Sequence, residues 1–197
     1  MSTAMEHDHA PTSDGGPAKK AWVLVESMFG NTETVGAAVA RGLALEGFDA
    51  EVFGVLDAPD RVPDDLALLV LGSPTHAFSM SRASTRADAV RQGADPERAT
   101  SGLREWLGGC HPGDHPPPVA VFDTRVSKVR RLPMAAGPAA RRLAHAKGFA
   151  VLDRPTYYLV DDVQGPLAAG EVARAAAWGR RIGALCQDWW TARALSR

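Results

Sequence analysis

The segment Ser27-Met28-Phe29-Gly30-Asn31-Thr32 has the residue types of an anion-binding loop. It lies between an apolar run at residues 21–26 and a stretch with helical periodicity at residues 32–46, so it would open a helix. The first N–H groups of a helix have no intrahelical acceptor, and the helix dipole favours negative charge there. Hydroxyl and amide side chains add donors, and Gly30 permits close approach of the backbone. Because the loop contains no Lys or Arg, we predict a phosphate site built from uncharged donors and a helix terminus.

Missing residues exclude three other kinds of phosphate-handling site. A P-loop needs Gly-Lys followed by Ser or Thr, and the chain has no such tripeptide. A dinucleotide-binding loop needs GxGxxG, but only Gly30 and Gly36 fall in this window. A phospho-receiver domain would need an Asp at the end of its third strand, whereas that apolar run ends in Gly72-Ser73-Pro74.

Apolar runs alternate with helical stripes along the chain. Strands are predicted at residues 21–26, 50–55, 66–71 and 119–122, and a fifth begins at 149–152, with 157–160 continuing or accompanying it. Helices are predicted at residues 32–46, 82–91, 101–107, 134–147 and about 170–194. This alternation predicts an α/β fold in three layers, with a doubly wound parallel sheet between two layers of helices.

The first residues differ in composition from the rest of the chain. Residues 1–19 are polar and rich in Gly, Pro and Ser, so we expect a disordered N-terminal leader before one domain at residues 20–197. His7 and His9 could together ligate a metal, but a flexible tail that happens to carry two histidines is the simpler interpretation. We therefore predict no metal site.

The composition excludes several classes of partner and location. The net charge is −1 and the charged residues are interspersed, which argues against a nucleic-acid partner. No run of 18 apolar residues could span a membrane, and the first 20 residues lack the apolar core of a signal peptide, so we predict a cytoplasmic protein. Cys110 and Cys186 form no CxxC pair, which indicates reduced thiols, and the place of Cys110 beside two glycines suggests an exposed loop.

The first loop resembles the signature of the flavodoxin family. Ser27, Gly30 and Thr32 match its hydroxyl, small and Thr positions, while Val25 replaces an aromatic residue and Gly36 replaces an Ala. Two more segments agree in order: 72–78 after the third strand and 122–125 after the fourth.

The resemblance covers about residues 21–187 and implies a particular fold and cofactor. Its ending, Gly165-Pro166-Leu167 with Gly170-Glu171 before a long helix, looks like that of flavodoxin-like proteins common in actinobacteria. The implied fold is a five-stranded parallel sheet in the flavodoxin-like order 2-1-3-4-5, and the implied cofactor is FMN.

The resemblance implies that FMN lies in three loops. No acid–base pair stands out in the sequence, so we predict no catalytic side chain. Phe78 is the best candidate for stacking on the flavin ring, whereas no second aromatic residue follows Asp123 before Tyr157. His76 could form a hydrogen bond with a substrate or the flavin, and a solvent-facing loop histidine is an equally good interpretation. Asp123 could be a substrate-facing acid, but a strand-end turn residue is the preferred interpretation. The residues expected to bind the cofactor are Ser27, Met28, Phe29, Gly30, Asn31, Thr32, Ser73, Pro74, Thr75, His76, Ala77, Phe78, Phe122, Asp123, Thr124 and Arg125.

Basic residues gather after the fourth strand, at Arg125, Lys128, Arg130 and Arg131. Since reduced flavin carries negative charge, a cation beside it would raise its reduction potential. We therefore predict a reduced couple that is less negative than in acidic electron-carrying flavodoxins.

Three functions remain open from the sequence. The leading one is an FMN-dependent redox protein, either an electron carrier or a small oxidoreductase, that serves a redox partner protein or a small-molecule acceptor. The alternatives are a binding or regulatory module of the same fold with weak or no flavin, and an NAD(P)H-dependent FMN quinone reductase.

Overall fold

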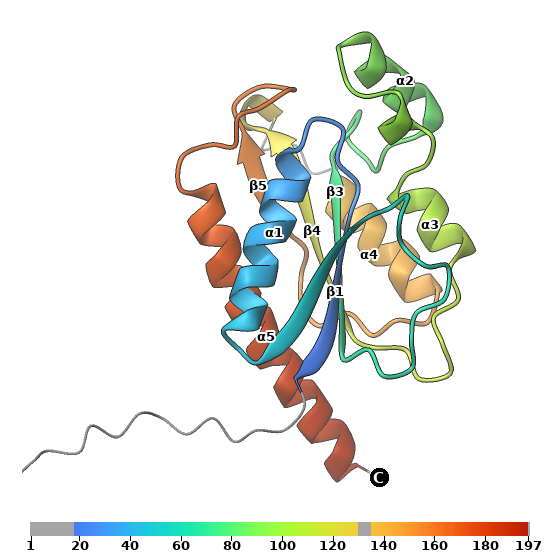
Figure 1. The fold of residues 1–197 in the computed structure, drawn as a ribbon, viewed down its shortest axis with the longest axis vertical. Coiled ribbons are helices and arrows are strands. Elements are labelled where there is room, and N and C mark those ends of the chain that lie inside the picture. Colours follow the sequence, from blue (N-terminus) through green and yellow to red (C-terminus); the bar gives the residue numbers. More distant parts are fainter. Residues whose placement is uncertain (1–17, 130–134, 197) are drawn as a thin grey trace, which may run out of the picture.

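Five parallel strands form the centre of the protein. The computed structural model describes residues 18–129 and 135–196, so nearly all of the predicted leader lies outside the described residues. The sheet has the order β2-β1-β3-β4-β5, with every neighbouring pair parallel, which confirms the predicted topology (Figure 1). The strands are β1 (Lys19–Val25), β2 (Phe48–Gly54), β3 (Leu68–Pro74), β4 (Val119–Val126) and β5 (Thr156–Val160).

Helices cover both faces of this sheet, as predicted. Helices α1 and α5 pack on one face and α3 and α4 on the other (Figure 1). The helical elements are α1 (Asn31–Ala44), α2 (Ala83–Arg91), the 3-10 turn η1 (Glu97–Ala99), α3 (Leu103–Gly109), the 3-10 turn η2 (Ser127–Val129), α4 (Ala136–Ala146) and α5 (Glu171–Leu195). Among the described residues, none of these helices is long and apolar enough to cross a membrane.

Each inner strand supplies apolar side chains to both layers. In β1, Val23 is buried against the α1–α5 layer and Leu24 against the α3–α4 layer, because successive side chains of a strand point to opposite faces. Both side chains are fully buried, which is why the strand reads as continuously apolar in the sequence.

Helices α1 and α5 approach each other so closely that glycines are needed at the contact. A Cβ atom on Gly42 would lie 2.1 Å from the carbonyl oxygen of Ala176, and one on Gly179 would lie 2.3 Å from that of Val39. Since both neighbours are backbone atoms, neither can swing aside. The two glycines thus set the distance between these helices, and with it the position of the loop that opens α1.

Helix α2 does not lie on a face of the sheet. It sits beyond the carboxyl ends of the strands (Figure 1). Ala89 of the helix and Ala94, just after the helix, form a small apolar cluster there with Met28 of the β1–α1 loop. The segment from α2 to η1 is therefore part of the surroundings of that loop.

The fifth strand begins later than predicted. Residues 149–152 are apolar, but they form only one isolated bridge, from Val151 to Val119 at the start of β4. A turn at residues 153–155, which contains a proline, then leads into β5. Strands β3 and β4 also run beyond their predicted apolar ranges, to Pro74 and Val126, because their polar ends remain paired between neighbouring strands.

Candidate functional site

The loop at residues 27–32 opens α1 with free amides, as predicted. Gly30 is the N-cap residue with a φ of 84°, a left-handed conformation that favours glycine. The first bond of the helix runs from the Thr34 N–H to the Gly30 carbonyl oxygen at 3.0 Å. The N–H groups of Asn31, Thr32 and Glu33 consequently have no intrahelical acceptor and can bind an anion.

Three loops enclose a pocket of about 210 Å³ at the carboxyl edge of the sheet, which we call the three-loop pocket. It is formed by the ends of β1, β3 and β4, where a doubly wound sheet binds its ligands. Its lining residues are Ser27, Met28, Phe29, Asn31, Thr32, Pro74, Thr75, His76, Ala77, Gln92, Thr124, Arg125, Val126, Val160 and Val163.

Eleven of the sixteen residues expected to bind the cofactor line this pocket, and five do not. Gly30 caps the helix, and Ser73 is fully buried in β3. The ring of Phe122 lies in the core, in edge contact with Tyr158 and Trp178, so its side chain is not available to a ligand. Phe78 and Asp123 also lie outside the lining, and Gln92, Val126, Val160 and Val163 join it without having been predicted.

Two hydroxyl groups of the pocket have contrasting environments. The Oγ1 atoms of Thr32 and Thr124 lie 2.8 Å apart and tie the first loop to the third. The Oγ of Ser27 is also buried, but no described residue forms a hydrogen bond with it. A buried hydroxyl without a partner costs folding free energy, and the Ser27 hydroxyl is therefore able to donate to a ligand.

The loop after β3 makes a tight turn at its tip. Ala77 and Phe78 have φ angles of 44° and 66°, and His76 and Ser79 exchange two backbone hydrogen bonds across them. Left-handed backbone at two consecutive residues other than glycine stores strain, which is typical of functional sites. The turn leaves Phe78 45% exposed at the rim. Burial lowers the pKa of His76, one of the lining residues, and so favours its neutral form.

The loop after β4 is built around a buried ion pair. Asp123 is fully buried, and its two oxygens accept hydrogen bonds from Nε and Nη2 of Arg125 at 2.8 and 2.7 Å. It also accepts hydrogen bonds from the Thr75 hydroxyl and from the Gly137 N–H at the start of α4. Asp123 is therefore a structural residue that joins two loops of the site and caps α4.

The same ion pair limits what Arg125 could add to the potential of a bound flavin, and the predicted less negative couple stays a prediction. Its charge is balanced by Asp123, and its guanidinium lies 4.3 Å from the centre of the Tyr157 ring. Lys128 is exposed, and Arg130 and Arg131 lie outside the described residues. Arg125 therefore does not support a strong electrostatic increase in the reduction potential of a bound flavin.

The loop after β5 reaches across the opening of α1. The Asn31 side-chain amide donates to the Gln164 carbonyl oxygen at 3.1 Å, and the Gln164 side-chain amide donates to the Gln92 carbonyl oxygen at 2.6 Å. Gly165, with a φ of 104°, lies against Asn31, where a Cβ atom would come within 2.6 Å of the side-chain oxygen. This cross-connection was not predicted, because neither the β5 loop nor the end of α2 carries a binding motif.

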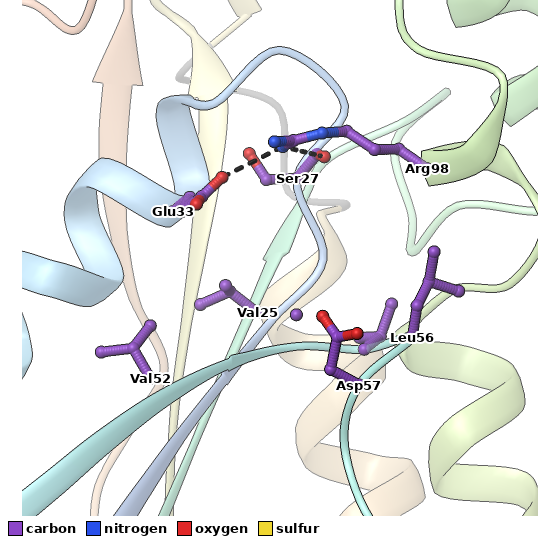
Figure 2. Close-up of a pocket in the computed structure, with 9 residues that line it drawn as sticks. Val25, Ser27, Glu33, Val52, Leu56, Asp57 and Arg98 are labelled. Carbon is purple, nitrogen blue, oxygen red and sulfur yellow. Dashed lines mark hydrogen bonds and ion pairs between the residues drawn. The ribbon is translucent and has the colours of Figure 1, made fainter.

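Arg98 also contacts the first loop, although the loop itself has no basic residue. Its Nη1 donates to the Ser27 carbonyl oxygen at 3.2 Å and lies 3.0 Å from Oε2 of Glu33 (Figure 2). A basic residue thus lies near this loop, bonded to protein groups, and the prediction that uncharged donors bind the phosphate stays a prediction. Below Arg98 lies a second pocket of about 190 Å³, the β2-side pocket, whose lining includes Val25, Val52, Leu56 and Asp57 (Figure 2).

A buried carboxyl group lies directly before Ser27. Glu26 is 1% exposed, and its Oε2 accepts a hydrogen bond from the Leu103 N–H at the start of α3, while its Oε1 has no partner among the described residues. Burial raises the pKa of Glu26, against the opposing effects of Ser81, Leu103 and Arg86.

This raised pKa makes the stability of the protein depend on pH. The folded state keeps the Glu26 proton to a higher pH than the unfolded chain, so the free energy of unfolding falls as pH rises above the ordinary carboxyl value of 4.5. Glu26→Gln should weaken this fall, as measured by urea unfolding at several pH values between about 4.5 and 8. Glu51→Gln, at an exposed position of β2, is the control. Equal pH dependence in Glu26→Gln and the native protein would contradict the assignment.

Both cysteines are buried, which corrects the expectation of an exposed Cys110. Burial raises the pKa of both thiols, that of Cys186 to about 12. Gly108 and Gly109 form the last residues of α3, Cys110 is its C-cap residue, and the Cys110 side chain packs in the α3–α4 layer. Among the described residues, no group of three or more His, Cys, Asp or Glu side chains could hold a metal ion.

Comparisons with known proteins give structural matches only. No protein-family model matches the chain, and no curated protein does. A flavodoxin from the domain Archaea aligns with a TM-score of 0.59 at 17% identity, over 85% of this chain and 99% of that one. The two-electron reduced flavodoxin of Megasphaera elsdenii aligns with a TM-score of 0.53 at 16% identity, over 82% and 98%.

Larger proteins contain the same fold. The alignment with the rubredoxin oxygen:oxidoreductase of Desulfovibrio gigas spans 87% of this chain but 37% of that one, with a TM-score of 0.56 at 14% identity. The likeness of the 165–171 ending to actinobacterial proteins stays a prediction. Together with the strand order, these alignments show that the chain has the flavodoxin-like fold.

Proposed function

We propose that the chain binds FMN in the three-loop pocket and acts as a redox protein, either an electron carrier or a small oxidoreductase. One observation carries the proposal: loops from β1, β3 and β4 meet at the carboxyl edge around the free amides that open α1. The residues there fit the cofactor, because the unpartnered Ser27 hydroxyl and these amides offer donors to a phosphate. A redox role draws support from the alignment with a flavodoxin studied in its two-electron reduced state.

The size of the pocket indicates how the cofactor would be held. About 210 Å³ is less than the 300–1,000 Å³ typical of pockets that enclose a whole ligand. We infer that the phosphate end is enclosed, whereas the ring lies at the rim, between the 76–79 turn and the loop after β5. Bound flavin would accept and release electrons or hydride, and the protein would hold it and leave a ring edge open to a redox partner protein or a small acceptor.

The experiment is a titration of flavin-free protein with FMN, followed by the quenching of flavin fluorescence. We expect a dissociation constant of about 1 µM or lower, and Ser27→Ala should weaken binding roughly tenfold by removing a phosphate donor. The same substitution should not destabilise the free protein, because the hydroxyl has no partner to lose. Ser84→Ala, at an exposed position of α2, is the matched control. No binding by the native protein would refute the proposal, and undiminished binding by Ser27→Ala would refute the placement of the phosphate.

The third loop favours one alternative, a binding or regulatory module with weak or no flavin. Tyr157 lies beside Asp123 on the neighbouring strand β5, and Arg125 already stacks on its ring. The N–H groups of Thr75 and His76 are already bonded, to Thr124 and Ser79, so fewer backbone donors remain for a ring. A dissociation constant above about 100 µM would favour this module. Oxidation of NADPH by the FMN-loaded protein would instead favour a quinone reductase.

A further inference from the structure

Arg98 lies at the first loop although it belongs to a distant part of the chain. It is in η1, 71 residues from Ser27, and the apolar cluster of Met28, Ala89 and Ala94 holds the preceding segment against the loop. Its guanidinium lies between the Ser27 carbonyl and the Glu33 carboxylate (Figure 2). Because both contacts are made by Nη1, one group acts on the loop backbone and on the first turn of α1 together.

The contact with Ser27 orients a peptide group. In a trans peptide, the carbonyl and the following N–H point in opposite directions. With the Ser27 carbonyl turned toward Arg98, the Met28 N–H points away from Arg98. Met28 and Phe29 both line the three-loop pocket, so this orientation favours an amide donor on the pocket side of the loop.

The contact with Glu33 compensates a charge. Glu33 is in the first turn of α1, where its carboxylate interacts well with the helix dipole but repels any anion bound at the same terminus. Arg98 is the ion-pair partner of that carboxylate, at 3.0 Å. Without Arg98, a phosphate at the opening of α1 would face an uncompensated negative charge.

We propose that Arg98 is a positioning residue that selects phosphorylated flavin. It orients the Ser27–Met28 peptide and neutralises Glu33, so the site prefers FMN over riboflavin. This inference rests on the proposed FMN site but concerns only the phosphate end of the ligand. A residue that merely supported the fold would affect both flavins equally.

The test compares the dissociation constants of FMN and riboflavin for the native protein and variants. Arg98→Ala should weaken FMN roughly tenfold while riboflavin changes by less than about twofold. Arg98→Lys, which keeps the charge but loses the geometry of the guanidinium, should lie between. Adding Glu33→Gln to Arg98→Ala should recover part of the loss, because the uncompensated carboxylate is gone.

Arg91→Ala is the matched control, since Arg91 pairs with Asp88 in the last turn of α2 and should leave both constants within about twofold of the native values. Thermal unfolding of each variant checks that it is folded. Equal losses for FMN and riboflavin in Arg98→Ala, or no loss for either, would overturn the inference and leave the FMN site standing. A native protein that binds neither flavin would refute the proposed function, and the inference with it.

Discussion

Replacing Asp123 with alanine is expected to lower the free energy of unfolding by about 3–5 kcal/mol, the usual cost of leaving a buried charge without its partner. Arg125 is about 10% exposed and would keep its charge without a counterion. The start of α4 would lose one of its acceptors as well, because the N-cap residue, Ala135, has no side-chain oxygen and Asp123 binds the Gly137 N–H instead. Urea unfolding at neutral pH measures the change.

Two further variants show whether the effect belongs to this ion pair. Asp123→Asn keeps the shape and an acceptor oxygen but loses the charge, so its cost should be smaller than that of the alanine variant. Asp65→Ala breaks an exposed pair with Lys20 and should leave the free energy of unfolding almost unchanged. If Asp123→Ala cost as little as Asp65→Ala, Asp123 would not hold the fold, and the interpretation of a substrate-facing acid would regain support.

Gly179→Ala is expected to destabilise the protein by roughly 2–3 kcal/mol, at the upper end of the cost of overpacking. The added methyl carbon would lie 2.3 Å from the Val39 carbonyl oxygen, so α1 and α5 would have to separate. Helix propensity alone predicts the opposite sign, because alanine is favoured over glycine in a helix by about 1 kcal/mol.

The control for Gly179→Ala is Gly108→Ala in α3, where a Cβ atom would meet nothing within 4 Å. There the propensity term acts alone, and the variant should be neutral or stabilised by up to about 1 kcal/mol. The midpoints and slopes of urea unfolding give both values. A stabilised Gly179→Ala would show that the two helices can move apart at little cost.

The elements that could be predicted are those with a regular pattern of apolar residues in the sequence. Buried parallel strands are apolar on both faces, so β1 and β3 stand out, and helices that cover a sheet carry an apolar stripe. The false start of the fifth strand at residues 149–152 has a local cause: a short apolar run pairs once with β4 and then turns away. Whether an apolar run pairs over several residues depends on the neighbouring strand, which cannot be identified from the sequence of the run itself.

The three-loop pocket was predictable for a topological reason. Loops that follow neighbouring parallel strands meet at one edge of the sheet, so residues 27–32, 72–78 and 122–125 had to converge. Some side chains at those loop positions line the pocket, whereas others, such as that of Phe122, are buried in the core. The sequence does not record which way a strand-end side chain points where polar and apolar residues mix.

The contacts of Arg98 and Gln164 could not be predicted. They join segments 71 and 133 residues apart through irregular backbone, which has no period to follow. The residues of the first loop alone do not indicate Arg98, because it belongs to η1, far along the chain.

The burial of Cys110 and Cys186 affects how the folded protein reacts with oxidants. Thiolates, not thiols, react readily with oxidants, and both cysteines of the chain are buried with raised pKa values. At neutral pH the folded protein therefore offers peroxides and disulfides almost no reactive thiolate. Repeated oxidation and reduction of a bound cofactor would therefore not join folded molecules through disulfide bonds.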